Sequence, residues 1–371
     1  MQLCSQQHPP TGISRRNHVC VHASGSASVA AKQAYRSKPA NQVNVLVVGP
    51  TGYIGRFVTK ELMARGYNVI AFAREQAGIK GKMGKEDTKK EFAGAQVVFG
   101  DVTDLQSLRD TAFSQPVDVV VSCLASRTGG KKDSWAIDYQ NVLDVARERG
   151  ASHFVLLSAI CVQKPLLEFQ RAKLQLEADL QAAGDISYSI VRPTAFFKSL
   201  AGQVELVKQG KPYVMFGDGQ LASCKPISEQ DLARFMADCI TDADKANAVL
   251  PIGGPGKALS AKEQAEILFR LTGRPPKFFP VPIALMDTII GIFDLLAKLF
   301  PALEDSAEFG RIGRYYAAES MLVWDEARQA YDADATPSYG TDTLEGFFQK
   351  ALSEGLKGQE LGDQAVFGVG E

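Results

Sequence analysis

Glycines at a fixed spacing mark the segment of the sequence that is best suited to bind a phosphate group. The run from residue 49 to 55 reads Gly-Pro-Thr-Gly-Tyr-Ile-Gly, after a short apolar segment and before residues with helical spacing. In such a run the first glycine allows a tight turn, the second lets the backbone approach a pyrophosphate, and the third lets the helix lie close to the strand. The helix N-terminus would then face the phosphates. A βα turn without a ligand is the alternative, but the motif predicts a dinucleotide site formed by Gly49, Thr51, Gly52, Tyr53, Ile54 and Gly55.

The residues after the second apolar segment indicate which nucleotide fits. Enzymes that use NAD place an acidic residue there, which binds the ribose 2′-hydroxyl. This sequence has Arg74 followed by Glu75. The guanidinium of Arg74 can pair with the 2′-phosphate of NADP, whereas Glu75 could serve the ribose of NAD. We expect NADPH as the cofactor, with Arg74 as the residue that recognises its 2′-phosphate.

Two later strand ends are also expected to line the nucleotide. Asp101 and Val102 follow the third apolar segment, where Asp101 can face the adenine. Cys123, Leu124 and Ala125 end the fourth segment, which would lie beneath the cofactor. In α/β folds ligands bind at the carboxyl ends of strands, but both positions are also ordinary strand ends.

A serine and a lysine occupy two of the three catalytic positions of short-chain dehydrogenases. Those enzymes carry a serine and then Tyr-x-x-x-Lys on a helix, where the tyrosine protonates a carbonyl oxygen. Here Ser158 and Lys173 fit the pattern, but Phe169 stands where the tyrosine would be. Phe169 and Lys173 are four residues apart and share one helix face, from which Lys173 can hold the ribose beside the nicotinamide.

The missing tyrosine limits the chemistry that Ser158, Phe169 and Lys173 can support. Reduction of a ketone needs an acid near the alkoxide as it forms. Hydride addition to a conjugated carbon–carbon double bond depends less on a strong local acid, because the negative charge spreads into the conjugated system. The pattern therefore favours reduction of an activated double bond. The alternative is a non-catalytic NADPH-binding sensor or assembly protein.

Apolar segments alternate with helical ones through the first half of the folded chain. Strands are expected at 44–48, 68–73, 97–99, 118–122, 153–157 and 187–191, and helices at 54–64, 105–113, 135–148 and 166–180. The alternation predicts parallel βαβ units with both faces of the sheet covered. We expect an α/β fold with a doubly wound parallel sheet of the Rossmann type. The NADPH-binding domain is expected at 41–191, a smaller C-terminal substrate lobe packed on the same sheet at 192–355, and a loose tail at 356–371.

Residues 1–40 differ in composition from the rest of the chain. They are rich in serine, they contain five Lys or Arg residues, and the first acidic residue of the sequence is Glu61. A basic, serine-rich and acid-free leader without a continuous apolar stretch is typical of an organelle transit peptide. We expect a disordered transit peptide, for a chloroplast rather than a mitochondrion on its serine content and on the family resemblance given below; a leader that is merely disordered is the alternative.

Charge and cysteine usage argue against several other classes of protein. The 371 residues include 41 basic and 42 acidic ones, a balance that disfavours a nucleic-acid binder. The six cysteines form no CxxC pair, and His153 is the one histidine outside the leader, so no metal site is expected. No uncharged apolar run reaches about 18 residues, so no transmembrane helix is expected.

Six longer stretches together resemble one family. They lie at 47–56, 119–127, 154–173, 189–200, 211–218 and 311–321. They are similar to the divinyl chlorophyllide a 8-vinyl reductases of plants and green algae, within the atypical, NmrA-like short-chain dehydrogenases/reductases, and the similarity covers essentially the whole chain after the leader. The resemblance implies a chloroplast enzyme of chlorophyll biosynthesis that reduces a conjugated 8-vinyl group to ethyl with NADPH.

A flat magnesium tetrapyrrole, the substrate that the resemblance implies, needs an apolar slot and a cation for its propionate. Phe196 and Phe197 can stack on the ring and Lys198 can meet the carboxylate, because all three follow the sixth strand at its carboxyl end. A helix start with buried aromatics is the alternative. Arg311, Arg314, Tyr315 and Tyr316 form a second candidate set. Chlorophyllide, protochlorophyllide and chlorophyll all stay open as the preferred substrate, as does the oligomeric state.

Residues 283–300 have the apolar content and spacing of an amphipathic helix. We expect this helix to dock on the core or between the lobes. The alternative is a surface that meets a thylakoid or envelope membrane, or another pigment enzyme. Asp287 and Asp294 fall on its polar side, which is not basic and so weakens the membrane alternative.

Overall fold

The computed structural model describes residues 33–78, 81–126, 129–139, 141–297, 300 and 304–356. Its centre is a sheet of seven strands in the order β3-β2-β1-β4-β5-β6-β9, in which every neighbouring pair is parallel. The strands are β1 (Asn44–Val48), β2 (Asn68–Ala73), β3 (Gln96–Phe99), β4 (Val119–Ser122), β5 (His153–Leu157), β6 (Ser187–Pro193) and β9 (Ala248–Ile252). This order is the doubly wound Rossmann arrangement. The expected fold class is therefore confirmed, and the six expected strands lie within two residues of the observed ones.

Helices connect these strands and build the rest of the molecule. In the first half they are η1 (Gln33–Ser37), η2 (Ala40–Gln42), α2 (Tyr53–Ala64), α3 (Lys85–Glu91), α4 (Leu105–Ser107), η4 (Leu108–Ala112), α5 (Lys131–Asp133), η5 (Ser134–Asp138), α6 (Val142–Glu148), η6 (Ile160–Gln163) and α7 (Glu168–Ala182). In the second half they are η7 (Phe197–Gln203), α8 (Val204–Lys208), α9 (Glu229–Thr241), η8 (Ala243–Lys245), α10 (Ala261–Thr272), α11 (Ile283–Ala297), α12 (Glu304–Ala318) and α13 (Leu344–Glu354). Three short strand pairs complete the described elements: β8 (Ser223–Cys224) with β10 (Leu259–Ser260), β7 (Tyr213–Phe216) with β11 (Phe278–Val281), and β12 (Val323–Asp325) with β13 (Ala330–Asp332).

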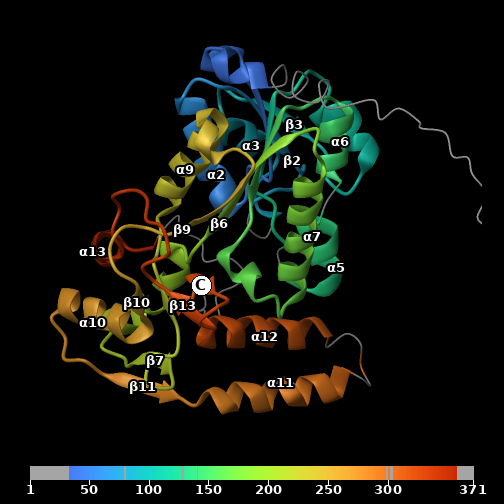
Figure 1. Ribbon diagram of the computed structural model, residues 1–371. Helices are drawn as coiled ribbons and strands as arrows, with labels where there is room; N and C mark the ends of the chain where they lie inside the picture. The colour runs from blue at the N-terminus through green and yellow to red at the C-terminus, as the bar shows by residue number, and fades with distance from the viewer. Residues whose placement is uncertain are drawn as a thin grey trace, which may run out of the picture.

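Both faces of the sheet are covered, because successive side chains of a strand point to opposite sides. In β1, Val47 belongs to the apolar cluster that includes residues of α2 and α9. Its neighbour Val48 belongs to the cluster on the other face, which includes residues of α6 and α7. Figure 1 shows these two pairs of helices on either side of the sheet. The sheet is therefore packed between two layers of helices, which fix the position of the loops at its ends.

The C-terminal half of the chain contributes to this body as well as to a lobe of its own. Strand β9 extends the sheet beside β6, and α9 lies against α2. A separate apolar core joins η7, α8, α10 and α13. Leu356, the first residue of the expected tail, packs against that core, and residues 357–371 lie outside the described residues. The sheet thus takes its last strand from beyond residue 191, and the other domain boundaries stay predictions.

The end of the leader is part of the folded body, which corrects the expected boundary at residue 40. Tyr35 in η1 is 2% exposed, and its ring stacks on His153 with centroids 6.2 Å apart. Lys38 pairs with Asp118 at 2.9 Å. A buried aromatic ring contributes about 3 kcal/mol or more to stability, so the contact holds residues 33–40 on the sheet. Residues 1–32, which include the rest of the expected transit peptide, lie outside the described residues.

His153 has a structural role at the start of β5. Its two ring nitrogens lie 2.8 Å from Ser187 Oγ and 3.1 Å from Ser189 Oγ. Burial, reinforced by the nearby positive charge of Arg36, lowers the pKa of His153 to about 3. The imidazole therefore stays neutral across the physiological range, and it is fully occupied by hydroxyl partners.

Candidate functional site

The phosphate loop is shaped by glycines that have no room for a side chain. Gly49 has a φ of +78°, and a Cβ on it would lie 2.9 Å from the carbonyl oxygen of Cys123, at the end of β4. A Cβ on Gly55 would lie 2.0 Å from the carbonyl oxygen of Gly49. Gly52 is the N-cap of α2 and has no side chain that could bond to the first N–H groups of the helix. The first turn of α2 contains no acidic residue. The first N–H groups of α2 are therefore suited to hold the phosphates of a dinucleotide.

Tyr53 and two residues expected to meet the substrate lie together next to this loop. The hydroxyl of Tyr53 donates to Glu229, and the Lys198 ammonium lies 4.3 Å from the Tyr53 ring centroid. The ring of Phe196 lies 6.2 Å from that of Tyr53. Burial, and then the Glu229 carboxylate, raise the pKa of the Tyr53 phenol above its ordinary value. Lys198 is only 4% exposed and forms part of this buried cluster.

Phe197 points away from the site. It is 2% exposed and packs against Phe347 in the core shared with α13. A ring buried on this side cannot stack on a ligand at the sheet edge. The expectation that both aromatics face the substrate is corrected here: Phe197 is a core residue, and Phe196 stays beside Tyr53.

The residues expected to recognise the adenosine end lie beyond β2 and β3. The pKa of Asp101 is lowered, mainly because its carboxylate accepts a hydrogen bond from the Thr103 backbone N–H. The positive charge of Arg74, which is exposed, lowers this pKa further. The competing acid, Glu75, forms an ion pair with Lys85 of α3. Val102, next to Asp101, is 8% exposed and packs in the apolar cluster below. Arg74 is therefore exposed, while the competing acid Glu75 is engaged in an ion pair.

Lys173 is held at the centre of the site by two groups. Its ammonium lies 2.9 Å from Asp138 Oδ1 and donates to the carbonyl oxygen of Leu124 at 3.3 Å. Asp138 ends the π-helical turn η5, and its Oδ2 accepts from the Ser126 backbone N–H at 3.1 Å. The fold thus brings Lys173 to the strand end at Leu124. Asp138 was missed by sequence reasoning, because the turn that aims it inward interrupts the helix expected at 135–148.

Ser158 has a different partner from the one that the dehydrogenase pattern implies. Its hydroxyl donates to the Glu177 carboxylate, which also pairs with Arg192 through Nε at 3.2 Å. Both Ser158 and Glu177 are buried. The Ser158 hydroxyl is therefore bonded to a buried carboxylate of α7, which also binds Arg192 of β6. It does not point toward Lys173 as the dehydrogenase pattern would require.

Phe169 lies in an apolar cluster between α7 and α12. Its neighbours there include Ile160, Cys161 and Tyr315. Cys161 is 2% exposed, and burial raises the pKa of its thiol. Lys173 counters part of this rise. Cys161 is a second member of the site that no sequence motif announced.

Arg311 and Arg314, the basic members of the second substrate set, form ion pairs with carboxylates of α11 and α12. Arg311 pairs with Asp294 of α11 and with Glu308 at 2.8 Å. Arg314 pairs with Asp287 of α11 at 2.8 Å. Paired guanidinium groups between two helices are not available to a propionate.

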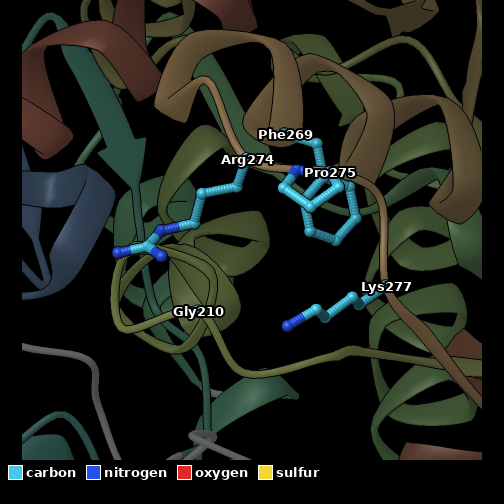
Figure 2. A pocket seen from close by; sticks show the side chains of 5 residues that line it. All are labelled: Gly210, Phe269, Arg274, Pro275 and Lys277. Atoms are coloured by element: carbon cyan, nitrogen blue, oxygen red, sulfur yellow. The ribbon is translucent and has the colours of Figure 1, made fainter.

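A small pocket lies apart from this site. It is lined by Gly210, Phe269, Arg274, Pro275 and Lys277, and Figure 2 shows that these residues come from α10, the segment after it and the turn at Gly210. None of them belongs to the candidate site. In the described part of the chain, no group of three His, Cys, Asp or Glu residues can share a metal ion. No helix among the described residues is long and apolar enough to cross a membrane.

Comparisons with known proteins place the chain among NAD(P)H-binding proteins. The family model for NAD(P)H-binding proteins matches residues 49–243. The chain is 62% identical to a protein of Cucumis sativus named divinyl chlorophyllide a 8-vinyl-reductase, chloroplastic, over 97% of this chain and 88% of that protein. It is 61% identical to the protein of the same name from Arabidopsis thaliana, over 92% and 84% of the two chains. Among solved structures, leucoanthocyanidin reductase with NADPH from Vitis vinifera has a TM-score of 0.59 at 18% identity, over 83% of this chain and 99% of that one, a likeness of fold.

Proposed function

The chain belongs to the divinyl chlorophyllide a 8-vinyl-reductase family of NAD(P)H-binding proteins, and from this premise we propose the reaction that it catalyses. It reduces the 8-vinyl group of divinyl chlorophyllide a to ethyl in the chloroplast, with NADPH as hydride donor, and yields monovinyl chlorophyllide a. The observation that carries the proposal is the pair Lys173–Asp138 beside Phe169. The pair suits a nicotinamide enzyme whose usual tyrosine is absent, as expected for reduction of a conjugated double bond.

Different residues of the chain bind the cofactor, orient it and exclude water. Gly49, Thr51, Gly52 and Gly55 hold the pyrophosphate at the N-terminus of α2. Lys173, aligned by Asp138, holds the nicotinamide ribose so that the ring lies against the vinyl group. When bound, NADPH supplies the hydride, which adds to the terminal vinyl carbon of the substrate. The apolar cluster around Phe169 excludes water from the reacting carbons.

NADPH is preferred over NADH because Arg74 is exposed while Glu75 is engaged with Lys85. Replacing Arg74 by Ala should weaken NADPH by about 1.5–3 kcal/mol, the value of one charge-assisted phosphate contact, and leave NADH almost unchanged. Titration of both nucleotides by protein fluorescence measures the difference. Glu75→Gln is the matched control and should keep the preference. Equal weakening of both nucleotides by Arg74→Ala would mean that another residue reads the phosphate.

The decisive experiment uses purified protein that lacks residues 1–32 but keeps the Tyr35 contact. Incubated with NADPH and divinyl chlorophyllide a, it should produce the monovinyl pigment, which is separated by chromatography. Tight NADPH binding without any change in the pigment would instead favour the alternative, a non-catalytic nucleotide sensor or assembly protein. Parallel assays with divinyl protochlorophyllide and divinyl chlorophyll rank the substrates.

The outer face of α11 is a second feature that fits a pigment enzyme. Its exposed side chains follow helical spacing and include Leu285, Ile289, Ile292 and Leu295, which is 63% exposed. The only charged residues within α11 are two aspartates, and both are paired with arginines of α12. Figure 1 shows α11 as the outermost helix below α12. We propose that this uncharged face rests on the lipid surface where the apolar pigment is available.

The lipid contact can be tested by sedimentation with vesicles of phosphatidylcholine and phosphatidylglycerol. The protein should sediment with the vesicles, and the double variant Leu285→Glu with Ile292→Glu should stay in the supernatant, because carboxylates cannot enter the hydrocarbon boundary. The control is Leu221→Glu, at a 45% exposed leucine outside α11. A double variant that still sediments, or wild-type protein that forms dimers through this face, would contradict the proposal.

A further inference from the structure

Helix α12 is fastened to the segments that follow β4 and β5. Glu308 Oε1 accepts from the Glu168 backbone N–H at 3.0 Å, at the start of the helix that carries Lys173. Tyr315 donates its hydroxyl to the carbonyl oxygen of Cys161 at 2.9 Å. A Cβ on Gly129 would come within 2.4 Å of Ile312. Figure 1 shows α12 running directly below α7. One face of α12 therefore forms a wall of the candidate site.

Tyr316, the next residue on α12, directs its hydroxyl into this site. The hydroxyl oxygen lies 3.9 Å from Cys161 Sγ, while 47% of the residue is exposed. Burial raises the pKa of Tyr316 well above its ordinary value, and the nearby Cys161 and Asp138 raise it further. The phenol therefore keeps its proton at any physiological pH.

We propose that Tyr316 is the proton donor of the reaction. The inference rests on the proposed function. Hydride addition to the terminal vinyl carbon leaves an electron pair on the pigment, delocalised from the adjacent carbon into the macrocycle. The Tyr316 O–H bond breaks, its proton bonds to that adjacent carbon, and the ethyl group is complete. The tyrosinate then regains a proton from water, so the balance is one hydride and one proton per vinyl group.

Several other hydroxyl groups around the site already donate to other partners. Phe169 has no proton to give, and Tyr315 donates to the Cys161 carbonyl oxygen. Tyr53 donates to Glu229, and Ser158 to Glu177. The Tyr316 hydroxyl combines a proton with a position 3.9 Å from Cys161 Sγ. Because Cys161 and Phe169 belong to one apolar cluster, α12 can supply the acid that Phe169 of α7 lacks.

Tyr316→Phe tests the proposal, because it removes the hydroxyl and keeps the ring. Turnover should fall by about 100-fold or more, the usual contribution of a general acid, with unchanged dissociation constants for NADPH and for divinyl chlorophyllide a. Turnover of the variant should also show a larger solvent deuterium isotope effect than wild type, since water then delivers the proton slowly. The matched control is Tyr339→Phe, which loses a structural hydrogen bond to Asp238 outside the site and should keep turnover within a few-fold.

A measurement on the protein without ligands complements the kinetics. With 3-fluorotyrosine at position 316, fluorine NMR should report a phenol pKa above that of free fluorotyrosine. A pKa equal to the free value would place the hydroxyl in solvent and overturn the proposal. So would a Tyr316→Phe variant with wild-type turnover, or a loss of activity seen only in Cys161→Ala. If wild-type protein leaves the pigment unchanged, the proposed function itself fails, an outcome distinct from all of these.

Discussion

Replacing Lys173 by Met should lower turnover by about 100-fold and weaken NADPH binding at the same time. The ammonium lies 2.9 Å from Asp138 and 3.3 Å from the Leu124 carbonyl oxygen, and the residue is 6% exposed. A group fixed from both sides can hold the ribose in one place, and a misplacement of about 1 Å in the bound nicotinamide costs about 100-fold in rate. Steady-state kinetics and nucleotide titration measure the two effects.

This variant needs a control for stability, because methionine leaves Asp138 buried without its partner. Breaking a buried pair costs about 3–5 kcal/mol, most of it from the remaining charge. The double variant Lys173→Met with Asp138→Asn removes both charges and should recover most of the melting temperature. It should not recover NADPH affinity or turnover. If the double variant regains wild-type kinetics, or if Lys173→Met alone keeps them, Lys173 does not serve the cofactor.

Replacing Gly55 by Ala should weaken NADPH by about 100-fold. The added Cβ would lie 2.0 Å from the carbonyl oxygen of Gly49, a backbone atom that can move only if the phosphate loop moves. The displaced loop loses two or more charge-assisted hydrogen bonds to the phosphates, each about 1.5 kcal/mol or more, and a factor of ten in affinity corresponds to about 1.4 kcal/mol. Isothermal titration with NADPH measures the loss.

The other end of the same helix provides the control for this substitution. Gly66 follows α2 with a φ of +82°, and a Cβ there would meet nothing within 4 Å. Gly66→Ala should therefore cost about 1 kcal/mol of stability through backbone strain, with no change in NADPH affinity. Equal affinities for Gly55→Ala and wild-type protein would show that the glycine run is a structural turn and not a phosphate loop.

Features that depend on short stretches of chain were predictable from the sequence. Strand β1 is an apolar run that ends in glycine, and a buried parallel strand requires just this pattern. Gly49 and Gly55 are needed because a Cβ would strike backbone atoms within the same turn or at the adjoining strand end. Lys173 was found through its spacing from Phe169 on one helix. Each of these signals is local, because the residues that interact lie close in the sequence or repeat with a regular period.

Features that depend on contacts between distant segments were decided by the tertiary structure. Asp138 reaches Lys173 through a π-helical turn, and no periodic pattern announces such a turn. The sequence did not reveal the ion-pair partners of Arg311, whereas in the fold its guanidinium pairs with two carboxylates. The composition of residues 1–40 assigned Tyr35 to the leader, but its ring packs on His153 in the core. Tyr316 lies 155 residues from Cys161 along the chain. The sequence by itself determined the nucleotide fold and the family, because both reside in local patterns. Only the packing of α12 on α7 decided which side chains share the site, because burial and pairing depend on the three-dimensional neighbours of each group.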